Sequence, residues 1–292
     1  MKRVNQLTIP QFEAQFPNDD ACKAYLVARR WPKGVHCPRC GNVKVYELTK
    51  PFHWQCQECA PAGYRFSVLV GTIFENTNYP LRTWFRVIHM MLTSKKGVSA
   101  LQVHRTIGTG SYRTAWSMCH RIRAGLQDEG FRRLMGVVEI DETYIGGNDR
   151  NRHSDKRKGH KDVKAIVAGA VRRRGNVIAR VIDQADGVTL GRFVYETVHT
   201  KISLLASDDN SAYSHLKARW PHKTVKHSRG EYVVGAVHTN TIEGFWSILK
   251  RGVVGTYHKV SKKYLPLYVA EFQFRYNNRK NADIFGKAIA GL

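Results

Sequence analysis

The sequence predicts an α/β protein made of three consecutive regions: a cysteine-rich region, a helical segment and a larger domain of strands and helices. Three observations support this division. Two Cys-x-x-Cys pairs lie among aromatic and turn residues near the start, the stretch after Pro80 is helical in pattern and free of proline up to 129, and from Val137 onward short β-branched runs alternate with helical stretches. We place the regions at 1–75, 76–130 and 131–292.

The chain is strongly basic. Its 292 residues include 47 Lys and Arg against 23 Asp and Glu, a formal net charge of +24. Such an excess favours a polyanionic partner, and nucleic acid is the first candidate; on composition alone, a ribosome-associated protein or a merely basic surface stays open. The chain has no apolar run of about eighteen residues and no signal-peptide core, which predicts a cytoplasmic protein without a membrane span.

The cysteine pairs of the first region indicate a zinc site. Cys37 and Cys40 are separated from Cys56 and Cys59 by fifteen residues, a spacing typical of a Cys₄ site. Four thiolates complete a tetrahedron and leave no open position, so we expect a structural zinc ion. Two reduced turns without metal are the alternative. The two isolated cysteines are expected to be buried, inert thiols: Cys22 and Cys119.

Three helices are expected over residues 81–126, and the last two have the form of a helix-turn-helix. Residues 108–110, Gly-Thr-Gly, supply its short turn, and Ser111 can cap the helix that follows. As a recognition helix, this last helix would offer polar and cationic side chains to a major groove. These are Tyr112, Arg113, Arg121 and Arg123. Plain packing of three short helices is the alternative.

The third region shows an order of three strands, a helix, a strand, a helix, a strand and a helix. The first strand is V-V-E-I-D-E-T-Y-I, the next two form a hairpin around 173–176, and the fourth ends at Asp208. The last helices are expected near 239–251 and 262–278. This α/β layer architecture matches a ribonuclease H-like fold.

Three acids lie where such a domain would hold metal ions. Asp141 lies in the first strand, Asp208 ends the fourth and Glu243 lies early on a helix. Adjacent strands and a packing helix would bring them together at one edge of the sheet, where carboxylates suit the two Mg²⁺ or Mn²⁺ ions of phosphodiester cleavage. Singly, each acid could be a turn former or a solvated side chain; their combined placement favours the metal site.

Several stretches carry a resemblance to a known family. The sequences R-W-P-x-G-x-x-C-P-R-C at 30–40, E-I-D-E-T-Y-I-G-G at 139–147 and H-T-N-T-I-E-G-F-W-S-I-L-K-R at 238–251 resemble insertion-sequence transposases with an N-terminal zinc ribbon and a DDE catalytic domain. E-F-x-F-R-Y-N-x-R at 271–279 also matches. The resemblance spans nearly the full length.

This resemblance implies a DNA transposase of the prokaryotic cytoplasm, associated with the nucleoid. It would cleave the terminal inverted repeats of its mobile element and join them to target DNA, both double-stranded, as a homo-oligomer on DNA. The resemblance implies that Asp141, Asp208 and Glu243 are the ligands of the catalytic metal, Mg²⁺ or Mn²⁺. Lys250, two turns after Glu243 on the same helix face, is expected to contact DNA, as is Arg251.

Some assignments stay open at this point. Asp209 follows Asp208 and could take its role; because successive side chains of a strand point to opposite faces, the two cannot readily face the same metal pair. The resemblance favours Asp208, five residues before Tyr213, and leaves Asp209 to cap the helix near Ser211. Asn240 could replace Glu243 as the third ligand. The polar stretch 148–164 is expected to be a mobile loop that grips phosphates. The alternative functions are a non-enzymatic DNA-binding regulator derived from a transposase and a nuclease without strand transfer.

Overall fold

The computed structural model describes residues 7–59, 61–127, 132–146, 164–225 and 238–292. These residues form two compact units. The first unit comprises Met1–Ser94, Val98–Leu126 and Arg279–Leu292, and the second comprises Lys95–Gly97 and Gln127–Asn278. Among the described residues, no helix is both long and apolar enough to cross a membrane.

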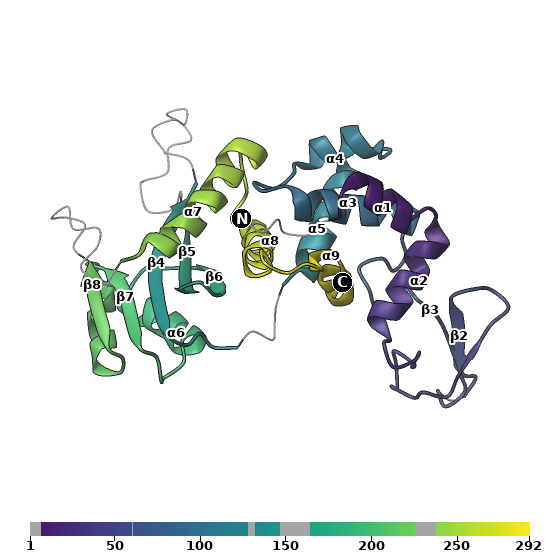
Figure 1. Ribbon diagram of the computed structural model, residues 1–292, viewed down its shortest axis with the longest axis horizontal. Coiled ribbons are helices and arrows are strands. Elements are labelled where there is room, and N and C mark those ends of the chain that lie inside the picture. The colour runs from purple at the N-terminus through teal and green to yellow at the C-terminus, as the bar shows by residue number, and fades with distance from the viewer. Residues whose placement is uncertain (1–6, 60, 128–131, 147–163, 226–237) are drawn as a thin grey trace. The chain divides into compact units, whose positions relative to one another are not determined.

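The first unit contains a small antiparallel sheet with an aromatic core (Figure 1). Its strands are β1 (Val45–Glu47), β2 (His53–Cys56) and β3 (Tyr64–Ser67), in the order β1-β2-β3. The rings of Trp31 and Trp54 lie 5.4 Å apart, and Trp54 packs on Phe66 at 5.9 Å. Because three short strands enclose little apolar area, this core depends on large rings and on the cysteine cluster described below.

Six helices complete the described part of the first unit. They are α1 (Ile9–Gln15), α2 (Asp19–Arg30), α3 (Leu81–Thr93), α4 (Ala100–Ile107), α5 (Tyr112–Gly125) and α9 (Ile284–Gly291). The three helices expected over 81–126 are present as α3, α4 and α5. Gly108 ends α4 with φ +73°, and the Ser111 side chain caps α5 by accepting from the backbone N–H of Thr114, as expected.

The helix α9 packs against α2 and α3, so the end of the chain belongs to the first unit. Phe285 of α9 lies 5.5 Å from both Phe16 and Phe85, ring centre to ring centre. Residues 279–292 were expected in the third region with the strands. They belong instead to the first unit, because their apolar side chains complete its helical core.

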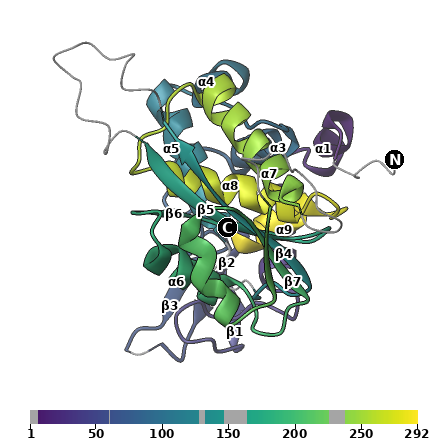
Figure 2. The same ribbon diagram turned by 90° about the vertical axis from the view of Figure 1, so that its left-hand side faces the viewer.

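A mixed five-stranded sheet forms the centre of the second unit (Figure 2). Its strands are β4 (Val137–Ile145), β5 (Ala165–Arg172), β6 (Val177–Ile182), β7 (Leu204–Asp208) and β8 (His222–Val225). They lie in the order β6-β5-β4-β7-β8. The pairs β4–β5 and β5–β6 are antiparallel, whereas β7 is parallel to both β4 and β8.

Helices cover both faces of this sheet. One face packs on α6 (Gly187–Thr197) and the 3-10 helix Ser211–Ala218, and the other on α7 (Asn240–Gly252) and α8 (Leu265–Asn277). A π-helix, Val253–Tyr257, extends α7. The expected order of strands and helices is therefore confirmed. Of the two last helices, α8 begins at Leu265 rather than near 262.

Alternation along β4 separates its side chains between the two cores. Val138 and Ile140 are buried against α6. Glu139 and Asp141 point to the α7 face, where each contacts a residue of that helix. One strand thus supplies apolar filling on one face and carboxylates on the other.

Candidate metal centres and nucleic-acid interface

The four paired cysteines of the first unit form one cluster. Their sulfur atoms all lie within 4.8 Å of one another, with Cys37 Sγ 3.8 Å from Cys59 Sγ and Cys40 Sγ 3.6 Å from Cys56 Sγ. Thiolates bound to zinc at about 2.3 Å would stand about 3.8 Å apart at the corners of a tetrahedron. The donor set and its spacing therefore fit a structural zinc ion.

Local backbone structure prepares this cluster for thiolates. Cys37 and Cys40 flank a tight turn closed by the bond from Gly41 N to Cys37 O, and Gly41 adopts φ +75°. Burial raises the pKa of the Cys37 thiol, but backbone hydrogen bonds from Cys40 and Arg39 outweigh it and bring that pKa to about 7. Burial and the neighbouring thiols raise the pKa of Cys59 to about 12. A metal ion would relieve this crowding of sulfur atoms.

Asp141 and Asp208 form an acid pair on neighbouring parallel strands. Glu139 of β4 pairs with Ala206 of β7, so two residues further Asp141 comes beside Asp208 on the α7 face. Burial, followed by the charges of Asp208 and Glu142, raises the pKa of Asp141 to about 7. Like charges this close oppose ionisation, and a divalent cation would restore it.

Hydrogen bonds orient both carboxylates of the pair. Asp141 accepts from Trp246 Nε1 at 3.0 Å and from the backbone N–H of Glu142 at 2.9 Å. Asp208 accepts from the backbone N–H of Asn210 at 3.2 Å. The carboxylate of Asp141 has acceptor capacity beyond these two bonds, as a metal ligand requires.

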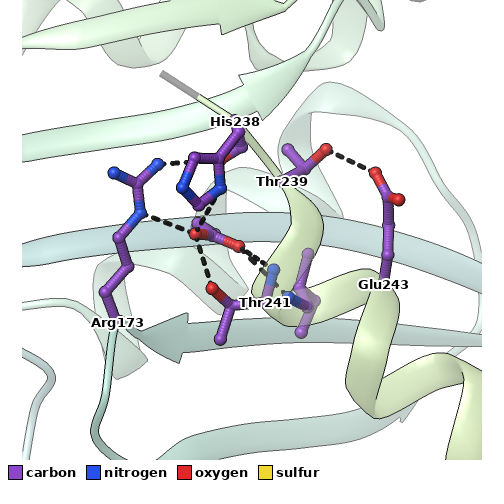
Figure 3. A network of polar contacts seen from close by, with 7 residues as sticks. Arg173, His238, Thr239, Thr241 and Glu243 are labelled. Atoms are coloured by element: carbon purple, nitrogen blue, oxygen red, sulfur yellow. Dashed lines mark hydrogen bonds and ion pairs between the residues drawn. The ribbon is translucent and has the colours of Figure 1, made fainter. Parts of the chain in front are cut away.

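Glu243 lies in the first turn of α7, the helix that packs on the same face. Its Oε1 accepts a hydrogen bond from Thr239 Oγ1 at 2.6 Å, and its side chain is exposed (Figure 3). Asn240, the alternative third ligand, is the first residue of the helix and also exposed. The structure places the two aspartates on neighbouring strands and Glu243 in the first turn of the helix that covers the same face. Among the described residues, only the four cysteines bring three or more possible ligand atoms together in one group.

Asp209 does not cap the following helix, and this expectation was wrong. The cap is Asn210, whose side chain accepts from the backbone N–H of Ala212 at 3.0 Å. The strand ends at Asp208, so Asp209 lies exposed in the turn. The helix begins one residue later than a cap at Asp209 would require.

Two further acids of β4, which the sequence interpretation did not single out, have defined partners. Glu139 is fully buried and accepts hydrogen bonds from Arg173, Thr241 and Ile242 (Figure 3). Glu142 accepts from Tyr213 Oη at 2.5 Å and from Asn210 Nδ2 at 2.7 Å. The signal available in the sequence was E-I-D-E itself, because a half-buried strand rarely carries three acids without partners.

The expected DNA-contacting side chains fall into two groups. Arg113, Lys250 and Arg251 are exposed; Arg251 also donates to the backbone oxygen of Ser247. Neither of the other two arginines of α5 is exposed. Arg121 donates to Glu75 O at 2.9 Å and lies over the Trp84 ring, and Arg123 is 1% exposed.

This corrects the expected recognition surface of α5. Arg121 is half-buried and Arg123 is buried, so of the four expected side chains only Tyr112 and Arg113, at the start of the helix, are exposed. The basic stretch 148–164 lies, except for Lys164, outside the described residues. Cys22 and Cys119 are buried, as expected.

Comparison with known proteins adds to this geometry. Residues 17–61 match the transposase zinc-ribbon domain, and residues 133–277 match the ISXO2-like transposase domain. The uncharacterized protein in transposable element ISH50 of Halobacterium salinarum is 27% identical over 266 residues, covering 86% of this chain and 89% of that protein.

The two domain matches agree with the structure, in which a cysteine cluster in a small sheet precedes a mixed sheet with paired acids. The chain is therefore an insertion-sequence transposase of the class that has a zinc ribbon and a DDE transposase domain. Within that class, the chain belongs to the ISXO2-like transposases.

A solved structure also matches, at low similarity. It is a chain of the simian T-cell lymphotropic virus intasome, determined in complex with PP2A regulatory subunit B56 gamma. That chain is 14% identical with a TM-score of 0.31, and the match covers 61% of this chain and 64% of the other, less than two thirds of its length. A likeness of this size carries no argument about function.

Proposed function

We propose that the second unit is a ribonuclease H-like catalytic domain that cleaves DNA at the ends of its mobile element and joins those ends to target DNA. The carrying observation is the Asp141–Asp208 pair on adjacent parallel strands, beneath the helix that bears Glu243. Support for the fold comes from the order β6-β5-β4-β7-β8, with an antiparallel first three strands and a parallel remainder.

Asp141, Asp208 and Glu243 would hold two Mg²⁺ or Mn²⁺ ions. When bound, these ions supply the positive charge that activates an attacking oxygen and stabilises the leaving one. The hydrogen bonds from Trp246 and Asn210 hold the two aspartates in place, so their orientation is set before DNA arrives. Water attack and attack by a freed 3′-hydroxyl are the same in-line displacement at phosphorus. One P–O bond forms as the opposite one breaks; the attacking oxygen gives up a proton and the leaving oxygen takes one.

DNA recognition is proposed for the first unit. The helix-turn-helix α4–α5, with exposed Tyr112 and Arg113 at the start of α5, would read the terminal inverted repeats. Lys250 and Arg251 would contact phosphates next to the acids. The zinc ribbon adds a second element for duplex DNA, and a homo-oligomer would bring two ends together.

The test is a cleavage and joining assay with labelled duplex ends, a target plasmid and Mg²⁺. Wild-type protein should cut the ends and transfer them to the plasmid. Glu243→Gln should lose both activities while DNA binding stays, because an amide does not neutralise a divalent cation. Asn240→Ala is the matched control on the same helical turn and should keep most activity.

Three outcomes would each change the proposal. Full activity of Glu243→Gln with none for Asn240→Ala would move the third ligand to Asn240. Cleavage without joining would indicate a nuclease, and DNA binding without any cleavage would indicate a regulator.

A further inference from the structure

We infer that two anchors hold α7 in register with β4 and thereby position Glu243 for the acid pair. One anchor is the buried carboxylate of Glu139, and the other is the hydrogen bond from Trp246 to Asp141. The inference rests on the proposed function, since it concerns how the third acid reaches the metal site. It makes Glu139 and Trp246 positioning residues.

The first anchor is a helix cap supplied from a strand. Thr239, the residue before α7, makes no side-chain capping bond to the helix backbone. Instead, the backbone N–H groups of Thr241 and Ile242, the second and third residues of α7, donate to Glu139 Oε2 at 2.8 and 3.1 Å. The Thr241 hydroxyl donates to Oε1 at 2.8 Å. A carboxylate at this position satisfies otherwise unpaired amides and complements the positive end of the helix dipole.

The first anchor also includes the β5–β6 turn. Arg173 in this turn donates from Nε to Glu139 Oε1 at 2.7 Å and from its terminal nitrogen to His238 O at 3.0 Å (Figure 3). His238 Nδ1 lies 3.2 Å from the same Oε1. Burying a carboxylate is costly unless such donors satisfy its oxygens. Glu139 is therefore saturated by donors, and this excludes it as a metal ligand.

The second anchor lies further along the same strand. Trp246 Nε1 donates to Asp141 Oδ2 at 3.0 Å, and the indole packs over Gly169, the β5 partner of Asp141. A Cβ at Gly169 would stand 2.5 Å from the Trp246 ring, a separation that real Cβ atoms do not show. Only glycine leaves room for the indole beside the acid.

The spacing of the two anchors matches on strand and helix. From Glu139 to Asp141, two residues of strand advance about 6.7 Å, and from Ile242 to Trp246, four residues of helix advance about 6 Å. Both sets of hydrogen bonds can therefore form at the same time only in one register of α7 along β4. Glu243 lies between the helix residues of the two anchors, so its place along the strand is fixed with them.

The test compares each anchor variant with a matched control in full-length protein. Glu139→Gln is paired with Glu271→Gln, a change at another fully buried carboxylate of the second unit that Arg275 of α8 contacts. Trp246→Phe is paired with Trp220→Phe, which removes an indole donor to His199 O. Hydrogen exchange is followed by mass spectrometry over 240–246 without metal or DNA. Mn²⁺ binding is followed by electron paramagnetic resonance, with Asp208→Asn as the baseline.

Exchange over 240–246 should rise at least about tenfold in Glu139→Gln, because the NH2 group of Gln replaces one of the two accepting oxygens. It should stay at the wild-type rate in Glu271→Gln. Trp246→Phe keeps an aromatic ring at this position and removes only the indole donor. This variant should therefore fold even if Glu139→Gln does not. It should weaken Mn²⁺ binding several-fold, whereas Trp220→Phe should not.

The inference would be overturned if hydrogen exchange over 240–246 were as slow in Glu139→Gln as in the wild type. It would also be overturned if Trp246→Phe bound Mn²⁺ as tightly as the wild type does. If Glu139→Gln does not fold, Mn²⁺ affinity in Trp246→Phe decides. Should the wild-type protein itself bind no Mn²⁺, the proposed function fails, but the exchange comparison still decides whether Glu139 anchors α7.

Discussion

At the scale of single residues, three acids of one strand differ in their roles because their partners differ. Glu139 is saturated by the start of α7, Glu142 by Tyr213 and Asn210, and Asp141 faces Asp208 with acceptor capacity to spare. The type of residue is nearly the same in each case. The hydrogen-bond donors around each carboxylate therefore distinguish a structural carboxylate from a candidate metal ligand.

The neighbouring aspartates should differ sharply in activity. Asp208→Asn is expected to abolish end cleavage with little loss of fold, because Asp208 lies beside Asp141 at the end of β7. Asp209→Asn should keep most cleavage, since Asp209 is exposed in the turn and the cap is Asn210. Cleavage of labelled ends in Mg²⁺ by both purified variants measures this, and the opposite ranking would assign the metal to Asp209.

Asp141 makes the stability of the metal-free protein depend on pH. Its pKa rises from 3.8 to about 7 on folding, so the folded state binds the proton more tightly and stability falls as pH rises through that window. At pH 8 Asp141→Asn should therefore be more stable than wild type, by on the order of 4 kcal/mol, and at pH 5 the difference should shrink.

Thermal unfolding at the two pH values, with and without Mg²⁺, measures this effect. Mg²⁺ should raise the Tm of wild type at pH 8 and leave Asp141→Asn unchanged. An Asp141→Asn protein that is less stable than wild type at pH 8 would contradict the role of burial and of Asp208.

At the scale of elements, the small sheet of the first unit depends on its cysteine cluster. Its three strands hold at most four residues each, which is too few for an independent core. Metal binding and local folding should therefore be coupled.

Removing one thiol should unfold this element alone. Cys40→Ser is expected to lose zinc and expose the sheet to protease, whereas Cys22→Ser, at a buried thiol outside the cluster, should keep one zinc per chain. Elemental analysis and limited proteolysis measure both effects. Freshly purified wild-type protein without zinc would refute the assignment.

At the scale of the whole molecule, the net charge of +24 gives a background attraction to any duplex, and a few exposed side chains would supply discrimination. Because Arg121 is half-buried and Arg123 is buried, the side chains of α5 proposed to contact bases are those of its first turn. Recognition and phosphate contact should then be separable by mutation.

Two single changes test this separation. Arg113→Ala should reduce the preference for the element's ends over random duplex, by about 1–3 kcal/mol if Arg113 reads a base. Lys250→Ala should weaken binding to both duplexes equally and reduce the salt dependence by about one counterion. Titrations at several salt concentrations measure both; equal effects of the two variants on end preference would contradict the division.

The sequence by itself determined the elements and the chemistry that spacing carries. Cysteine spacing predicted the metal cluster, hydrophobic periodicity predicted the strands and helices of the second unit, and strand alternation put Asp208 and Asp209 on opposite faces. These features are local, because neighbours along the chain decide them.

The tertiary structure decided what depends on contacts between distant residues. It bonded Arg121 to Glu75 and buried Arg123, added residues 279–292 to the first unit, and moved the helix cap from Asp209 to Asn210. It also showed that Glu139 caps a helix 102 residues further along the chain, at Thr241. Burial and partner geometry act through space, so periodicity and spacing carry no record of them.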